Sequence, residues 1–170
     1  ENGQHMLECG ACYAPLILEQ GEWYRVFFSM FLHFGAHHLI NNILVLFVLG
    51  QRLEPAVGKL KFLLIYIAGG LGGNLISLFW DIHTGDYSVS AGASGAVFAL
   101  MGGMIYVIMR HRGRVADLTI RQMLIMAAFS LYFGFASEGV DNAAHAGGLV
   151  CGFLTAVIVY HPRKIWKIVP

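Results

Sequence analysis

Ser94 is the residue of this chain whose surroundings best suit a nucleophile. It stands in Gly92-Ala-Ser94-Gly95, after a polar loop and at the first turn of a long apolar run. The glycines let another backbone come close, and a helix start offers unpaired N–H groups at the positive end of the helix dipole. An oxyanion that forms beside Ser94 would be stabilised there. A structural interpretation stays open, because serine is also a favoured N-cap of a helix.

A serine needs a base at neutral pH, and the histidines of the chain supply the candidates. Histidine titrates near neutral pH, and we predict that His145 takes the proton of Ser94. His38 and Asn42 are four residues apart, so they share one helical face. Both can donate hydrogen bonds to a developing oxyanion, and the backbone N–H of Ser94 would be a third donor.

Small residues predict that the helices carrying Ser94 and His145 pack closely. They recur at four-residue intervals in the two apolar runs, at Ala144, Gly148, Gly152 and Ala156 and at Gly95, Ala99 and Gly103. Such strips let membrane helices approach each other. One turn below Ser94, the ring of Phe98 could stack on the imidazole and orient it, because no acid is placed to act as a triad aspartate. The predicted supporting residues are Gly92, Gly95, Phe98, Asn142 and Gly148.

The composition indicates that membrane helices hold these residues. Of the 170 residues 57% are hydrophobic and 12% are charged, against roughly 25% charged residues in an average soluble domain. We therefore predict an all-α, polytopic helical bundle in a membrane. Residues 1–22 are expected to be an extracytoplasmic loop or interfacial segment, residues 23–161 the membrane domain, and residues 162–170 a basic cytoplasmic tail. Five spans are expected, at Trp23 to Leu49, Phe62 to Trp80, Ser94 to Met109, Leu118 to Ser137 and Ala144 to Tyr160.

The charges predict the orientation of these spans. Ten of the eleven Lys and Arg residues lie around the first and third connections or in the tail, and only Arg25 lies elsewhere. Eight of the ten acids lie in the N-terminal segment, the second connection and the last turn. Lys and Arg are retained on the cytoplasmic side, so the N-terminus is expected outside and the C-terminus inside. The spans of His38, Ser94 and His145 then begin at one extracytoplasmic depth, where a polar cluster is costly and suggests function.

Together these features resemble the rhomboid family of intramembrane serine proteases over nearly the whole chain. The resemblance rests on Glu22-Trp23-Tyr24-Arg25, His33, His38-Leu-Ile-Asn-Asn42, Gly92-Ala-Ser94-Gly95 and Ala144-His145-Ala-Gly-Gly148 with Gly152. It implies a helical bundle with Ser94 as nucleophile and His145 as base, and an oxyanion site made by His38, Asn42 and backbone amides. It also implies transmembrane protein substrates, cut in or near a membrane segment that locally unwinds.

Two departures from the family pattern are visible. Phe98 occupies a position that is commonly tyrosine, so ring stacking is kept and a hydroxyl contact is lost. The family core also has a span ahead of the Trp-Tyr-Arg region. We expect this sixth span upstream of Glu1 in the full protein, or associated as a separate helix. The expected location is a bacterial plasma membrane, with the active site toward the extracytoplasmic side.

Other functions are supported by fewer residues. A metal-ion transporter would use four histidines, at His33, His37, His38 and His145. It would also need carboxylate or thiolate partners within the spans, where only Cys151 lies. A catalytically inactive relative that binds membrane clients stays an alternative. His33 itself is open between a scaffold role and substrate contact.

We expect no bound metal, no cofactor and no nucleic-acid partner. Cys9 and Cys12 form a lone Cys-x-x-Cys without a second half, which is weak evidence for zinc. No basic cluster is typical of nucleic-acid binding. The expected partners are therefore the lipid bilayer and transmembrane substrates.

Overall fold

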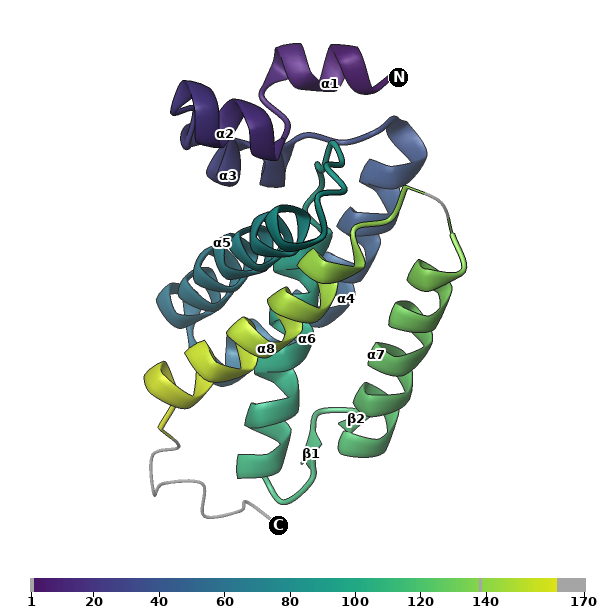
Figure 1. Ribbon diagram of the computed structural model, residues 1–170. Helices are drawn as coiled ribbons and strands as arrows, with labels where there is room; N and C mark the ends of the chain where they lie inside the picture. Colours follow the sequence, from purple (N-terminus) through teal and green to yellow (C-terminus); the bar gives the residue numbers. More distant parts are fainter. Residues whose placement is uncertain (1, 138, 162–170) are drawn as a thin grey trace.

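Helices make up most of the described structure, as the apolar runs predict. The computed structural model describes residues 2–137 and 139–161, so the predicted tail 162–170 lies outside the described residues. Figure 1 shows short N-terminal helices lying across one end of a bundle of longer helices. The prediction of an all-α membrane bundle is confirmed, with one small β-hairpin added. The elements are α1 (Gly3–Cys9), α2 (Ala14–Gln20), α3 (Tyr24–Phe28), the 3-10 helix η1 (Ser29–Phe31), α4 (Ala36–Val57), α5 (Lys59–Thr84), α6 (Ser94–Arg110), β1 (Arg114–Val115), β2 (Leu118–Thr119), α7 (Ile120–Phe135) and α8 (Asn142–Val159).

Helix α6 is the centre of the bundle. Nearly all of its residues from Gly95 to Ile108 are buried. A helix that is apolar on every side belongs in an interior, and α4, α5 and α8 all pack against α6. The first turn of α6, which begins with Ser94, is therefore largely enclosed by its neighbours.

Glycines set how closely α5, α6 and α8 approach one another. A Cβ atom at Gly148 of α8 would overlap the carbonyl oxygen of Gly95, and one at Gly152 would overlap that of Ala99. A Cβ at Gly69 of α5 would lie only 3.2 Å from the Cα of Gly152. Backbone therefore meets backbone at contacts that only glycine allows. The predicted strip of small residues is confirmed, and it includes α5 as a third helix.

The predicted span from Trp23 to Leu49 is not one helix, and that part of the prediction is wrong. α3 and η1 end at Phe31, and α4 starts at Ala36 after a bend of 87°. Gly35 permits the break because its φ is +88°, a region that other residues rarely adopt. The apolar residues continue through the bend, so composition does not reveal it.

The connection predicted between the spans that end at Leu49 and begin at Phe62 is also mostly helical. α4 continues to Val57 and α5 begins at Lys59, so the chain turns at Gly58 alone, where φ is +89°. Pro55 lies in the last turn of α4. These longer helices place the basic residues of this region on helix ends rather than in a loop.

Residues 2–22 contain the two short helices α1 and α2, which are tied to the bundle. The buried guanidinium of Arg25 donates to Glu22 at 2.5 Å and to two carbonyl oxygens of this segment at 2.7 and 3.0 Å. Cys12 exchanges two backbone hydrogen bonds with Ser90. The N-terminal segment therefore lies against the loop that leads into α6.

α7 stands apart from the other long helices along much of its length (Figure 1). The β1–β2 hairpin leads into it, and Thr119 and Gln122 form a capping box at its start. Arg52 of α4 donates two hydrogen bonds to the carboxylate of Asp117 in the hairpin, at 2.6 and 2.7 Å. These bonds hold the pKa of Asp117 down to about 2, so the pair stays ionised at neutral pH. The hairpin end of α7 is thus fastened to α4.

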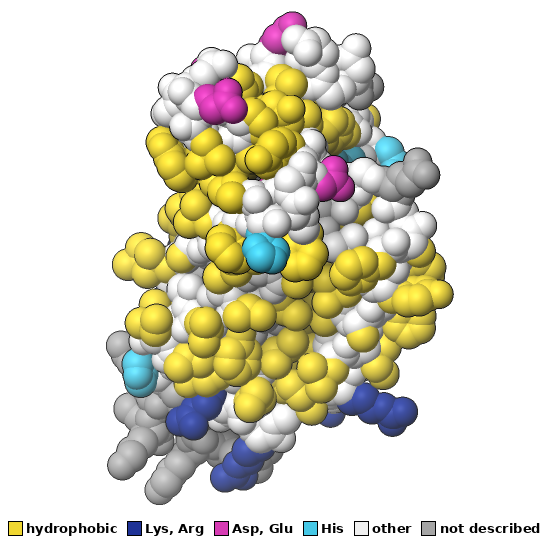
Figure 2. All heavy atoms as spheres, viewed as in Figure 1, with side chains coloured by type: hydrophobic (Ala, Val, Ile, Leu, Met, Phe, Trp, Pro, Cys, Tyr) yellow, Lys and Arg dark blue, Asp and Glu magenta, His cyan; other side chains and the backbone are white. Residues whose placement is uncertain are grey.

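The surface suits a membrane. Figure 2 shows hydrophobic side chains over the middle of the molecule, with Lys and Arg at the lower end and Asp and Glu toward the upper end. By length and composition α5 and α8 can each cross a bilayer, and the bent pair of α3–η1 and α4 is a third candidate. α6 and α7 are apolar but shorter. The number of five spans stays a prediction.

Candidate active site

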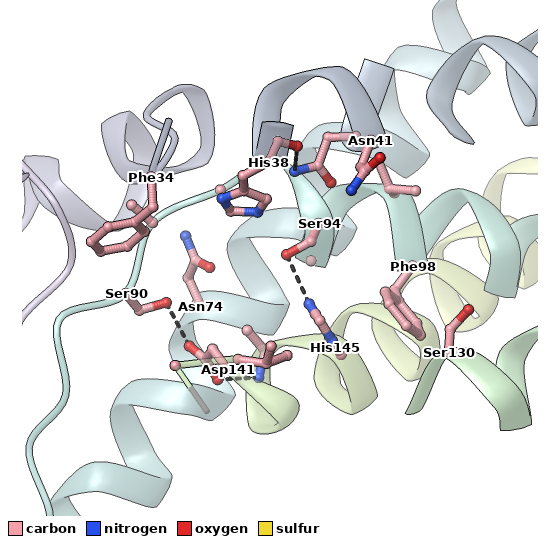
Figure 3. Close-up of a pocket in the computed structure, with 18 of the residues that line it drawn as sticks. Phe34, His38, Asn41, Asn74, Ser90, Ser94, Phe98, Ser130, Asp141 and His145 are labelled. Carbon is pink, nitrogen blue, oxygen red and sulfur yellow. Dashed lines mark hydrogen bonds between the residues drawn. The ribbon is translucent and has the colours of Figure 1, made fainter. Parts of the chain in front are cut away.

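Ser94 and His145 meet between the first turns of α6 and α8. The Oγ of Ser94 lies 2.8 Å from the Nε2 of His145, within hydrogen-bond range (Figure 3). His145 is only 9% exposed, so water competes little for this contact. When the ring proton is on Nδ1, Nε2 can accept the hydroxyl proton of Ser94. A nucleophile and its general base need this arrangement.

Phe98 orients the imidazole of His145. The two rings are stacked, with centroids 4.4 Å apart and an angle of 14° between their planes. Phe98 lies one turn after Ser94, so α6 carries both the serine and the ring that supports its partner. The Nδ1 of His145 is buried and has no hydrogen-bond partner among the described residues. In a soluble triad a carboxylate on this nitrogen fixes the imidazole, whereas here the contacts of the ring are the bond to Ser94 and the stacking on Phe98.

His38 and Gly92 form the wall beside Ser94. A Cβ at Gly92 would lie 2.8 Å from the Cε1 of His38, 3.1 Å from its Nε2 and 3.6 Å from the Oγ of Ser94. Gly92 also has φ +145°, so both its conformation and its surroundings require glycine. The imidazole of His38 thus lies next to the hydroxyl of Ser94 (Figure 3), where it can face a developing oxyanion.

His33 precedes α4 and supports this wall. Its ring packs edge-on against the ring of His38, with centroids 5.1 Å apart. Its Nε2 accepts the backbone N–H of Ala93 at 3.4 Å. These contacts tie the start of α4 to the start of α6. Of the two roles left open for His33, a scaffold role and substrate contact, they fit the scaffold role.

Asn42 is buried one turn after His38 and also borders the site. Its amide nitrogen donates to the backbone carbonyl of His38 at 3.2 Å. An amide carries two N–H groups, so the second can point toward a bound substrate. The predicted pairing of His38 and Asn42 on one helical face is therefore present, and both residues line the same cavity as Ser94.

The cavity beside Ser94 has a volume of about 860 Å³. One part of its wall is polar and includes Asn74, Ser90 and Asp141. Another part is apolar and includes Val45 of α4 and Met101 of α6. α7 contributes to the lining as well, so the cavity reaches from the loop before α6 to the helix that stands apart from the bundle.

Asp141 is a residue of this region that the sequence reasoning missed. Asp141 caps α8 and accepts hydrogen bonds from two serine hydroxyls. From the sequence alone it is only one of the acids expected on the extracytoplasmic side. Aspartate is a favoured N-cap, and Asp141 stands two residues before the apolar run that starts at Ala143. This position could have indicated a helix cap. Asn142 itself packs against Gly134 of α7, where a Cβ would overlap its Oδ1, and does not line the cavity.

Comparison with known proteins covers most of the chain. The family model described as the Rhomboid domain matches residues 20–162. Rhomboid protease GluP of Bacillus subtilis is 35% identical over 147 residues, which are 86% of this chain and 28% of that protein. Rhomboid protease AarA of Providencia stuartii is 35% identical over 167 residues, covering 85% of this chain and 59% of the relative.

A plant protein shows the same likeness. RHOMBOID-like protein 5 of Arabidopsis thaliana is 33% identical over 150 residues, covering 86% of this chain and 48% of its own length. The chain thus spans between about a quarter and three fifths of the length of these three relatives. The residues that the family model matches, 20–162, include the helices that hold Ser94 and His145.

Proposed function

The chain belongs to the rhomboid family of integral membrane proteins, and we propose that it is a serine endopeptidase whose catalytic dyad is Ser94 and His145. The observation that carries the proposal is the 2.8 Å contact between the Oγ of Ser94 and the Nε2 of His145. The stacked ring of Phe98 supports it, because a fixed imidazole is a better base for one particular hydroxyl.

The reaction proceeds through an acyl-enzyme. His145 takes the hydroxyl proton of Ser94 as the oxygen attacks the carbonyl carbon of the scissile bond, and the imidazolium then protonates the leaving amine. The backbone N–H of Ser94, the ring of His38 and the amide of Asn42 stabilise the oxyanion. A water molecule, activated by His145, then hydrolyses the ester.

The substrates are transmembrane proteins that reach the cavity from the lipid. A peptide bond inside a membrane helix is shielded by its own hydrogen bonds, so the segment must unwind before it can be cut. The cavity offers polar groups such as Asn74 at one part of its wall, which can replace lost backbone partners. Access between α4 and α7 agrees with the lining of the cavity, to which α4 contributes Val45 and α7 contributes Ser130.

The site faces the extracytoplasmic side in this proposal. Lys and Arg gather at the end of the molecule opposite the N-terminal helices (Figure 2), and such residues are retained in the cytoplasm. The N-terminal helices lie against the loop that precedes Ser94. The dyad therefore lies near the N-terminal helices, at the end of the molecule opposite the Lys and Arg residues.

Two measurements on the purified protein test the proposal. A fluorophosphonate probe should label the wild type, and a test transmembrane substrate should be cleaved, while Ser94→Ala and His145→Ala should lose both activities. Thermal unfolding of each variant should stay close to that of the wild type, which separates loss of chemistry from loss of fold. Cleavage by purified Ser94→Ala would refute the proposal. Binding of membrane proteins without labelling or cleavage by the wild type would favour an inactive, client-binding relative.

A further inference from the structure

Asp141 connects three segments that surround Ser94 and His145. Its Oδ1 accepts the backbone N–H of Ala144 at 2.8 Å and so caps α8. Its Oδ2 accepts the hydroxyl protons of Ser77 in α5 and of Ser90 in the loop before α6, both at 2.6 Å. Figure 3 shows the bond from Ser90, next to the pair formed by Ser94 and His145.

These bonds are strong for their kind and costly to lose. Both hydroxyl contacts, at 2.6 Å, are at the short end of the range for O–H···O hydrogen bonds. Ser77 is only 5% exposed, so its hydroxyl would be left buried without this acceptor if the carboxylate were removed. The carboxylate therefore fixes α5, α8 and the loop relative to one another.

Two of these three segments, α8 and the loop before α6, adjoin the residues of the dyad. Ser90 stands four residues before Ser94, and its backbone also pairs with Cys12 of the N-terminal segment. On the other side, the backbone N–H of His145 donates to the backbone carbonyl of Asp141 at 3.1 Å. Without the Asp141 carboxylate, the loop before Ser94 and the first turn of α8 could move independently of each other.

We propose that Asp141 is a positioning residue that holds Ser94 and His145 in register, through the hydroxyl of Ser90 on one side and the cap of α8 on the other. The inference rests on the proposed function, because it concerns the alignment of that dyad. Asp141 does not contact the reacting atoms. Its effect should therefore appear in kcat rather than in KM.

Three variants and one matched control test this role. Asp141→Ala should lower kcat and the rate of fluorophosphonate labelling by about 10- to 100-fold, since a misplacement of about 1 Å can cost about 100-fold. Asp141→Asn should recover most of the activity, because asparagine also caps helices and its amide can donate to the serine hydroxyls. Ser90→Ala removes one bond and leaves the cap of α8 intact, so its loss should be smaller. Asp86→Ala removes an exposed acid of the same loop and should behave as the wild type.

A double variant distinguishes positioning from a general loss of stability. If Ser90 acts through the carboxylate, Ser90→Ala should add little to the effect of Asp141→Ala, whereas unrelated effects would multiply. Thermal unfolding and KM are measured for each protein. If Asp141→Ala does not fold, the comparison of Ser90→Ala with Asp86→Ala decides the question.

The outcomes are separable from those of the proposed function. Three results would overturn the positioning role while the dyad stands. The first is a wild-type cleavage rate in Asp141→Ala, and the second is a fall in rate that the unfolded fraction explains. The third is a double variant in which the two rate reductions multiply. If only Ser90→Ala and Asp86→Ala can be compared, equal rates in the two overturn it. A wild type that reacts no faster than Ser94→Ala would overturn the proposed function and this inference with it.

Discussion

Replacing Gly148 by alanine should separate α8 from α6 at the level of the dyad. The new Cβ would overlap the carbonyl oxygen of Gly95 and would lie 2.9 and 3.2 Å from its carbonyl carbon and Cα. These are backbone atoms, which cannot rotate away as the end of a flexible side chain can. The two helices themselves must therefore move apart.

The size of this movement predicts a larger loss of rate than of stability. A separation of about 1 Å would stretch the contact between Ser94 and His145 from 2.8 Å beyond hydrogen-bond range, and a misplacement of that size can cost about 100-fold in rate. Overpacking typically costs about 1 to 3 kcal/mol, and the better helix propensity of alanine returns up to about 1 kcal/mol. The variant should stay folded while its kcat falls.

The assay compares Gly148→Ala with Gly50→Ala, a matched change in the interior of α4. A Cβ at Gly50 would lie 3.6 Å from the ring of Phe62, an ordinary contact, so this variant should keep wild-type activity. Cleavage of a transmembrane substrate and fluorophosphonate labelling are measured together with thermal unfolding in the same detergent. Wild-type kcat in Gly148→Ala would refute the reasoning, because it would mean that the backbone contact does not set the distance between the dyad residues.

Asn42→Ala should lower kcat by roughly 100- to 1,000-fold with little change in KM, because an oxyanion donor acts on the transition state. A change in KM alone would assign Asn42 to substrate binding. Cysteines introduced at Val45 and Ser130, which line the cavity from α4 and α7, should when crosslinked block a transmembrane substrate more than a short soluble peptide. Equal loss for both substrates would indicate a distorted site, and each cysteine alkylated alone is the control. Burial and two nearby carboxylates raise the pKa of Cys12 to about 12, so at pH 8 only about one Cys12 thiol in 10,000 is ionised. Maleimide should therefore label the exposed Cys9 far faster than Cys12. Similar labelling rates at the two cysteines would contradict the packing of the N-terminal helices.

Local patterns were sufficient to predict the helix packing near the dyad. Gly148 and Gly152 recur at the interval that places both on one face of α8, and lipid gives helices no hydrophobic reason to associate other than such close contact. The stacking of Phe98 on His145 follows from the same packing, since Phe98 is one turn from Ser94. The membrane class follows from composition, because so few charges are available to cover a soluble surface.

Features that depend on tertiary contacts were not predictable in this way. The bend before α4 requires a single glycine, Gly35, within a stretch that has apolar residues on both sides. The role of Asp141 depends on Ser77 and Ser90, which are 64 and 51 residues away in the chain. Distances of that kind have no periodicity for a sequence pattern to reveal.

The fastening of α7 at its hairpin end has a mechanical consequence. α7 has 16 residues and is therefore a rod about 24 Å long, held near Asp117 by Arg52 of α4. A rotation of about 12° about that end would move the other end by about 5 Å, close to the spacing of neighbouring strands in a sheet. Such a rotation would widen the gap between α7 and the bundle most beside Ser94 and hardly at all at the hairpin end. One extended chain could then reach the dyad from the lipid while the bilayer keeps its barrier to ions.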